Sequence, residues 1–102
     1  MELDLLRKLV KEGRWRMTLH ALKRCDQRRV SINDVMRLLL DGTLVEDYPD
    51  DRPFPSCLLR CELEQGHLYG VCAVGDGLVH VITVHWLDPD KWLDPDTRRD
   101  RS

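Results

Sequence analysis

The sequence lacks the short motifs that mark several common classes of protein. No CxxC pair occurs among its four cysteines, so the spacing gives little support for a zinc site. No GxGxxG or P-loop run occurs, which argues against the common nucleotide-binding domains. The apolar runs are short and the first residues are acidic, so neither a signal peptide nor a transmembrane span is predicted. We therefore expect a cytoplasmic protein that needs no cofactor.

A long basic tract is also missing, and the formal net charge of −2 is not that of a strong nucleic-acid binder. The charge is nevertheless uneven. Residues 1–42 contain ten Lys or Arg and six Asp or Glu, a net of +4, whereas residues 43–102 contain six and twelve, a net of −6. An anion-binding site is therefore expected on the basic first part of the chain.

The 102 residues, 42% of them hydrophobic, correspond to one globular domain. We place this domain at residues 1–96 and expect the charged tail, residues 97–102, to be disordered. In the cytoplasm the four cysteines, Cys25, Cys57, Cys61 and Cys72, are expected to be thiols. Cys57 and Cys61 share one side of a predicted strand, which favours core packing over metal binding.

Three stretches with helical periodicity come first, at about residues 2–12, 18–29 and 31–42. Thr18 and Ser31 are the predicted N-caps of the second and third helices, with Asp34 completing a variant of the capping box. Gly13 and Gly42 end the first and third helices. The apolar side of the second helix is predicted to consist of Leu19, Leu22 and Cys25, with Ala21 beside it.

After Gly42 the period shortens towards 2, which predicts strands at 43–47, 56–64, 67–74 and 78–86. Gly75-Asp76-Gly77 is a hairpin signal between the last two strands, and residues 48–55 must form a loop. The predicted fold is therefore an α+β domain with N-terminal helices packed on one face of a four-stranded, mainly antiparallel sheet. The other face, or its edge against the second helix, is then free for function.

His20, Arg24 and Arg28 recur at a spacing of four and should line one face of the second helix. This stripe combines a titratable imidazole with two fixed cations, which suits an anionic ligand such as a phosphodiester. A solvated basic face is the alternative. In the last strand, strict alternation places Thr83 and His85 on one face and His80 on the other, where His80 would be a packed histidine.

These residues match the needs of metal-free RNA cleavage, which requires a base, an acid and cations beside the phosphate. His20 and His85 are candidates for the acid and the base. Arg24, Arg28 and Arg60 are candidates for holding the phosphate, and Tyr48 for donating a hydrogen bond.

The chain resembles a small bacterial family catalogued as a domain of unknown function. The resemblance covers about residues 18–92. It rests on His20-Ala21, Arg24, Arg28, Val30-Ser31, Asp34-Val35, Gly42, Val45–Pro49, Pro55–Leu58, Ile82–His85, Pro89-Asp90 and Trp92. Two positions depart from the family pattern, because His85 stands where tyrosine is usual and Leu68-Tyr69 where Leu-His is common.

The resemblance implies a RelE-like fold, as in the RelE and MqsR toxins of toxin–antitoxin systems, and some members lie beside genes for zinc-finger antitoxins. It places His20, Arg24 and Arg28 on the matched helix and Tyr48 on the matched loop. We therefore expect an endoribonuclease that acts by general acid/base chemistry on RNA and is bound by a cognate antitoxin. Its predicted catalytic residues are His20, Arg24 and His85, and its predicted binding residues are Arg28, Tyr48, Arg60 and Thr83.

Two other hypotheses remain open from the sequence. The first is a non-catalytic module that docks another protein through the basic helix or the Trp86/Trp92 segment. The absence of a long basic tract favours this module over the ribonuclease. The second is a metal-binding role for the cysteines and histidines, which has less support.

Overall fold

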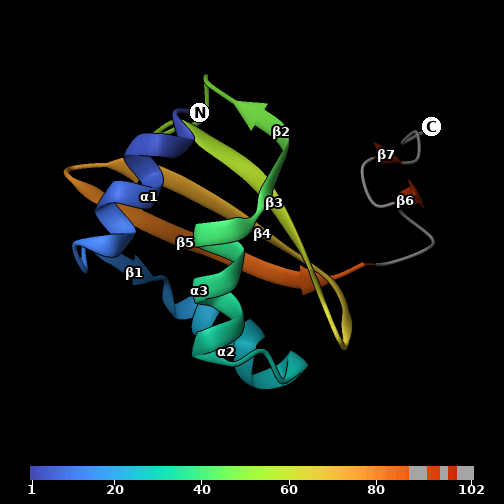
Figure 1. Ribbon diagram of the computed structural model, residues 1–102. Helices are drawn as coiled ribbons and strands as arrows, with labels where there is room; N and C mark the ends of the chain where they lie inside the picture. Colours follow the sequence, from blue (N-terminus) through green and yellow to red (C-terminus); the bar gives the residue numbers. More distant parts are fainter. Residues whose placement is uncertain (88–91, 95–96, 99–102) are drawn as a thin grey trace.

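Three helices and a five-stranded sheet make up most of the computed structural model, which describes residues 1–87, 92–94 and 97–98 (Figure 1). The helices are α1 (Leu3–Lys11), α2 (Leu19–Arg28) and α3 (Ile32–Asp41). The strands of this sheet are β1 (Trp15–Met17), β2 (Thr43–Tyr48), β3 (Ser56–Leu63), β4 (Gly66–Gly75) and β5 (Leu78–Trp86). The predicted α+β class is therefore correct.

The sheet differs from the prediction in its number of strands and in one direction. Its strand order is β1-β5-β4-β3-β2, and β2 to β5 form the expected antiparallel run. The additional strand, β1, pairs in parallel with β5, so the sheet is five-stranded and mixed. The prediction of four mainly antiparallel strands was wrong because Trp15–Met17 is too short to show a periodicity, and its partner lies more than sixty residues away.

The predicted helix caps are confirmed. The Thr18 hydroxyl accepts a hydrogen bond from the backbone N–H of Ala21 at 3.1 Å. At the start of α3, Ser31 and Asp34 form a reciprocal capping box with two hydrogen bonds of 3.0 Å. These side chains satisfy N–H groups that have no partner within the helix, and so they fix where α2 and α3 begin.

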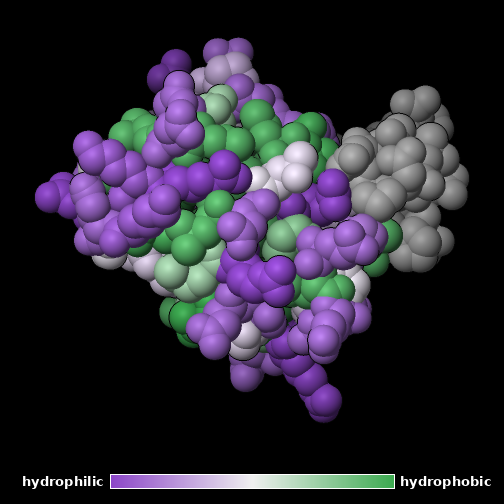
Figure 2. Space-filling model, in the orientation of Figure 1, coloured by the Kyte–Doolittle hydropathy of each residue, from purple (hydrophilic) through white to green (hydrophobic). Residues whose placement is uncertain are grey.

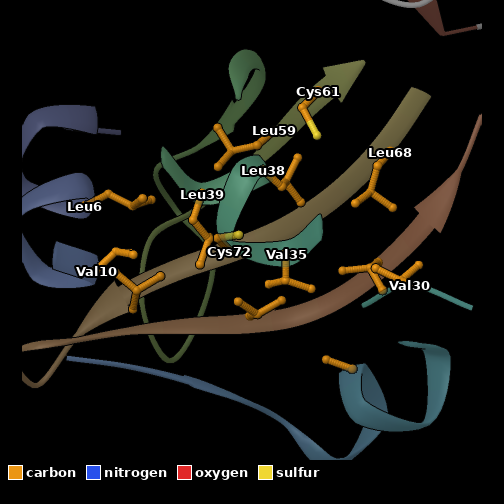
Figure 3. Packing of buried hydrophobic residues seen from close by; sticks show 14 of the residues in the cluster. Leu6, Val10, Val30, Val35, Leu38, Leu39, Leu59, Cys61, Leu68 and Cys72 are labelled. Carbon is orange, nitrogen blue, oxygen red and sulfur yellow. The ribbon is translucent and has the colours of Figure 1, made fainter. Parts of the chain in front are cut away.

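The main hydrophobic core lies between the helices and one face of the sheet, as expected (Figure 3). Leu6 and Val10 come from α1, while Val35, Leu38 and Leu39 come from α3. Their partners on the sheet include Cys57, Leu59, Cys61, Leu68, Cys72, Val79, Val81 and Val84. Gly70 lets α3 pack closely, because a Cβ at this position would lie 2.5 Å from Cδ2 of Leu38.

The opposite face of the sheet, called the open face below, carries a second and smaller apolar cluster. Leu58 and Tyr69 are fully buried there. Val45, Tyr48, Val71 and Leu87 pack around them. The open face is therefore an apolar surface that also carries several polar side chains.

Helix α2 lies along the edge of the sheet, where it continues from β1 beside β5. It buries Ala21 and Cys25, whose small side chains allow a close approach to the sheet. Leu19 and Leu22, which were predicted to face the core, are 67% and 46% exposed. The predicted apolar side of this helix was therefore correct at Cys25 and wrong at Leu19 and Leu22, because α2 packs on the sheet through its smaller side chains.

The helical side of the molecule has a mainly hydrophilic surface with smaller hydrophobic patches (Figure 2). No helix among the described residues is both long and apolar enough to cross a membrane. Near the end of the chain, the backbones of β6 (Trp92–Asp94) and β7 (Thr97–Arg98) pair as a two-stranded hairpin. Pro89 and Asp90 of the sequence resemblance, and residues 99–102 of the predicted disordered tail, lie outside the described residues.

Candidate functional site

A β-bulge in β5 determines which side chains reach the open face. Val71 of β4 pairs with Thr83, and the next residue, Cys72, pairs with Val81, so Ile82 is an extra residue with no partner in β4. Such a bulge reverses the alternation of side chains beyond it. Val79, Val81 and Val84 all face the helix-covered core as a result.

The bulge brings His80, Thr83 and His85 to the same face. His80 is opposite Ala73, Thr83 is opposite Val71, and His85 is opposite Tyr69. The prediction that His80 and His85 point to opposite faces was therefore wrong, because it assumed an unbroken alternation along the strand. The open face carries more titratable side chains than the sequence pattern indicated.

The start of α2 is attached to β5 at this bulge. The Thr18 N–H donates to the Val81 carbonyl, and the Thr18 hydroxyl donates to the Ile82 carbonyl, both at 3.0 Å. In the first turn of the helix, Nε2 of His20 lies 3.2 Å from Oγ1 of Thr83. The His20 side chain is exposed, so the ring is held against the open face and remains accessible to a ligand.

The other two members of the helical stripe lie further along the edge. The Arg24 side chain is partly buried and donates to Oε1 of Gln27 at 3.1 Å. The Arg28 side chain is exposed, and the Arg28 carbonyl accepts from the Trp86 indole N–H at 2.9 Å. The two bonds to Thr83 and Trp86 hold α2 along β5 at both ends, so the stripe borders the open face.

Tyr69, His85 and Arg60 form one row across the open face. His85 is stacked on Tyr69, with ring centroids 5.3 Å apart and an angle of 8° between the rings. Arg60 is the partner of Tyr69 on the opposite side, in β3, and is partly buried. Tyr48 contributes to the apolar cluster under this row. The structure thus brings His20, Thr83, His85, Arg60 and Tyr48 to a single face.

A second row contains residues that the sequence analysis did not select. Ser56, Ala73, His80 and Arg16 are successive partners across β3, β4, β5 and β1. Nδ1 of His80 lies 2.9 Å from a guanidinium nitrogen of Arg16, and Nε2 lies 3.0 Å from the Gly75 carbonyl. Because arginine only donates and a carbonyl only accepts, these two contacts suit a ring that accepts at Nδ1 and donates from Nε2.

This row forms one wall of a pocket of about 380 Å³. The other lining residues are Thr18 and Ile82 beside the bulge, and Asp51, Arg52, Pro53 and Phe54 of the β2–β3 loop. This pocket has no local signal in the sequence, because its residues come from four strands, the N-cap of α2 and a loop. The nearest clue was the position of Arg16 and Thr18, which precede His20 at intervals of two.

The cysteines take no part in either row. All four are free thiols in the core, as expected for Cys57 and Cys61 from the strand pattern. Burial raises the pKa of each of the four thiols, and for Cys57 it raises the pKa to about 11. Among the described residues, no group of three or more His, Cys, Asp or Glu is placed to hold a metal ion.

Comparison with known proteins places the chain in a family. No curated protein matches the sequence. The pattern of one protein family matches residues 17–86, which span α2, α3 and the strands from β2 to β5. The matched region includes His20, Arg24 and Arg28 as well as the open-face residues Arg60 and His85. The chain therefore belongs to the family described as Domain of unknown function (DUF4258).

Proposed function

We propose that this protein is a metal-independent endoribonuclease of a toxin–antitoxin system, with a RelE-like arrangement of helices and sheet. The observation that carries the proposal is the contact between Nε2 of His20 and Oγ1 of Thr83, on the face that also bears His85. Two accessible or partly accessible imidazoles on one face are the minimum equipment for acid/base cleavage of a phosphodiester. The mixed sheet with one face left open by the helices is compatible with the proposed fold relationship.

In this mechanism one histidine removes the proton from the 2′-hydroxyl as the 2′-oxygen attacks phosphorus. The other histidine protonates the 5′-oxygen as its bond to phosphorus breaks. The products are a 2′,3′-cyclic phosphate and a 5′-hydroxyl. Thr83, which contacts His20, and His85 are two residues apart in β5, so their Cα atoms are separated by about 7 Å. In this proposal the phosphate binds between the two imidazoles.

Thr83 is suited to hold His20 during this proton exchange. Because Nε2 contacts Thr83, the proton exchange with the RNA would use Nδ1, and the Nε2–H group would donate to the Thr83 hydroxyl in both states of the ring. The stacked ring of Tyr69 restricts the orientation of His85. Arg24, Arg28 and Arg60 supply cations around the face, and the planar guanidinium suits phosphate oxygens. We assign Tyr48 to the binding of the RNA chain.

The test is cleavage of RNA by the purified protein in excess EDTA, with analysis of the product ends. We expect cyclic phosphate ends, and we expect the double variant His20→Ala, Arg24→Ala to lose cleavage by at least about a hundredfold. Lys23→Ala is the matched control, because it removes an exposed cation from the same helix outside the stripe. Undiminished cleavage by the double variant would overturn the proposal.

A second candidate function is a non-catalytic module that binds a partner protein. It is favoured by Leu19 and Leu22, two large apolar side chains that α2 leaves exposed. The partner in a toxin–antitoxin system would be the antitoxin, of the zinc-finger type in the relatives that the sequence resembles. These leucines can also serve the ribonuclease, because an antitoxin bound there would lie next to His20.

Expression in a growing culture separates the two functions. Toxicity that the neighbouring gene product relieves, and that His20→Ala, Arg24→Ala abolishes, supports the enzyme. Equal tolerance of the wild type and this double variant supports the module. The variant Leu19→Ser, Leu22→Ser should weaken partner binding in either case, and Leu5→Ser, on the exposed side of α1, is its control.

A further inference from the structure

The pocket beside the bulge has no role in the mechanism described above. Its volume of about 380 Å³ lies within the range of small-molecule sites. Most of its surface is apolar, formed by Ala73, Ile82, Pro53 and Phe54. Two guanidinium groups, from Arg16 and Arg52, and one carboxylate, from Asp51, are its charged groups. This combination fits a flat ligand that has an anionic substituent and hydrogen-bond donors.

The wall formed by the β2–β3 loop is held in place by several contacts. Phe54 is stacked on His80, with centroids 5.3 Å apart and an interplanar angle of 16°. The phenyl ring also lies over Gly75, where any Cβ would collide with it. The hydroxyl of Ser56, a fully buried residue, donates a hydrogen bond to the Asp51 carboxylate. The pocket is therefore largely formed before a ligand arrives, which lowers the cost of binding.

The cations of the pocket have donors to spare. Arg16 uses one guanidinium nitrogen for His80, and a guanidinium offers five N–H donors. The bond to His80 fixes the plane of the Arg16 group, while Arg52 is exposed on the loop. Both guanidinium groups line the same pocket, and a phosphate group is an anion that such groups bind well.

The carboxylate selects among the bases. A carboxylate accepts hydrogen bonds and repels acceptors, so it favours a base edge with adjacent donors. Guanine presents N1–H and the N2 amino group side by side. Adenine and cytosine present one amino group next to a ring acceptor, and uracil presents one N–H between two carbonyl oxygens. From this chemistry we propose that the pocket binds a guanine nucleotide, with the base against the apolar wall, Asp51 on its donor edge and the phosphate at Arg16 and Arg52.

The position of the pocket relates this ligand to the proposed site. Thr18 and Ile82 line the pocket. His20 follows Thr18 by two residues and Thr83 follows Ile82 directly, so the contact between His20 and Thr83 lies next to the pocket. A guanine bound here would therefore place the adjacent phosphodiester beside His20. This assignment of the nucleotide to an RNA chain rests on the proposed function, and it predicts cleavage next to guanosine.

The experiment is a calorimetric titration of the purified protein with the 5′-monophosphates of guanosine, adenosine, cytidine and uridine, whose phosphate would lie at Arg16 and Arg52 and leave the 3′ side of the nucleotide towards His20. We expect guanosine 5′-monophosphate to bind more tightly than the other three by on the order of tenfold or more. Asp51→Asn should remove this preference, while Arg52→Ala should weaken the binding of all four nucleotides to a similar extent. Asp50→Asn is the matched control, because Asp50 is exposed in the same loop and does not line the pocket.

The outcomes separate the pocket from the enzyme. Equal affinity for the four nucleotides, no binding, or a guanine preference that survives in folded Asp51→Asn would overturn the pocket assignment. Arg52→Ala alters an exposed loop side chain, so the anion arm can be measured even where Asp51→Asn is unstable. Guanine-selective binding without RNA cleavage would reject the ribonuclease and keep the pocket. RNA cleavage without any nucleotide preference would keep the ribonuclease and reject the pocket.

Discussion

The substitution Thr18→Ala tests how α2 is attached to the sheet. The Thr18 hydroxyl accepts from the Ala21 N–H and donates to the Ile82 carbonyl, so the substitution removes two hydrogen bonds. Loss of an N-cap costs about 1 kcal/mol. Loss of the bond to the Ile82 carbonyl costs about 1 kcal/mol more, the typical net contribution of one hydrogen bond. We expect the free energy of unfolding to fall by about 2 kcal/mol, and Tm by roughly 10 °C.

Ser31→Ala is the matched control, since it removes the other N-cap. The Ser31 hydroxyl accepts from the Asp34 N–H in an exposed capping box, and within the part of the chain that the structure describes it makes no hydrogen bond to the sheet. Its loss should cost about 1 kcal/mol. The free energy of unfolding of both variants would be measured in urea, with circular dichroism as the signal and one common slope of free energy against urea concentration. Thr18→Ser keeps the hydroxyl and should recover most of the lost stability.

The comparison can refute the reasoning directly. A cost for Thr18→Ala no greater than the cost for Ser31→Ala would show that the bond to the bulge contributes nothing. If His20 acts in cleavage, Thr18→Ala should also slow the reaction at a temperature where both variants are folded, and Ser31→Ala should not. Equal activity of the two variants would mean that the cap does not position His20.

Three further predictions concern the core and the sheet edge. Gly70→Ala should lower the free energy of unfolding by about 1–3 kcal/mol, because its Cβ would collide with Leu38; unchanged stability in urea would show that α3 can shift freely. Trp86→Phe should cost about 1 kcal/mol through the lost bond to the Arg28 carbonyl, with hydrogen exchange in the last turn of α2 as the local readout. Burial raises the pKa of Cys57 from 9.0 to about 11, so the stabilisation from its neutral thiol should be complete below pH 9 and should decrease as the pH rises towards 11. In urea titrations at several pH values, Cys57→Ala should make the free energy of unfolding fall less steeply over this range.

The sequence was sufficient where structure depends on neighbouring residues. The caps Thr18 and Ser31 act within their own first helical turn, so their residue types predicted where α2 and α3 begin. The limits of β5 were also predicted correctly, because a hairpin signal precedes a long alternating run. The orientation of α2 was not, since Ala21 and Cys25 face the sheet for reasons of fit that hydrophobicity does not measure.

The candidate site depends on the features that local patterns do not contain. The prediction assumed strict alternation through Val79–His85, although two apolar residues, Val81 and Ile82, are adjacent there. The pairing of β4 with β5 shows that Ile82 is an extra residue. Without this bulge, a strand that buried Val79 and Val81 would also turn Thr83 and His85 into the core and Val84 out to the open face. One unbroken alternation therefore cannot bury all three valines and also present Thr83 to His20. The bulge allows both, and Thr18 stabilises it by bonding the carbonyls of Val81 and Ile82. The single extra residue is therefore what places the guanine pocket and the His20–Thr83 contact side by side on the open face.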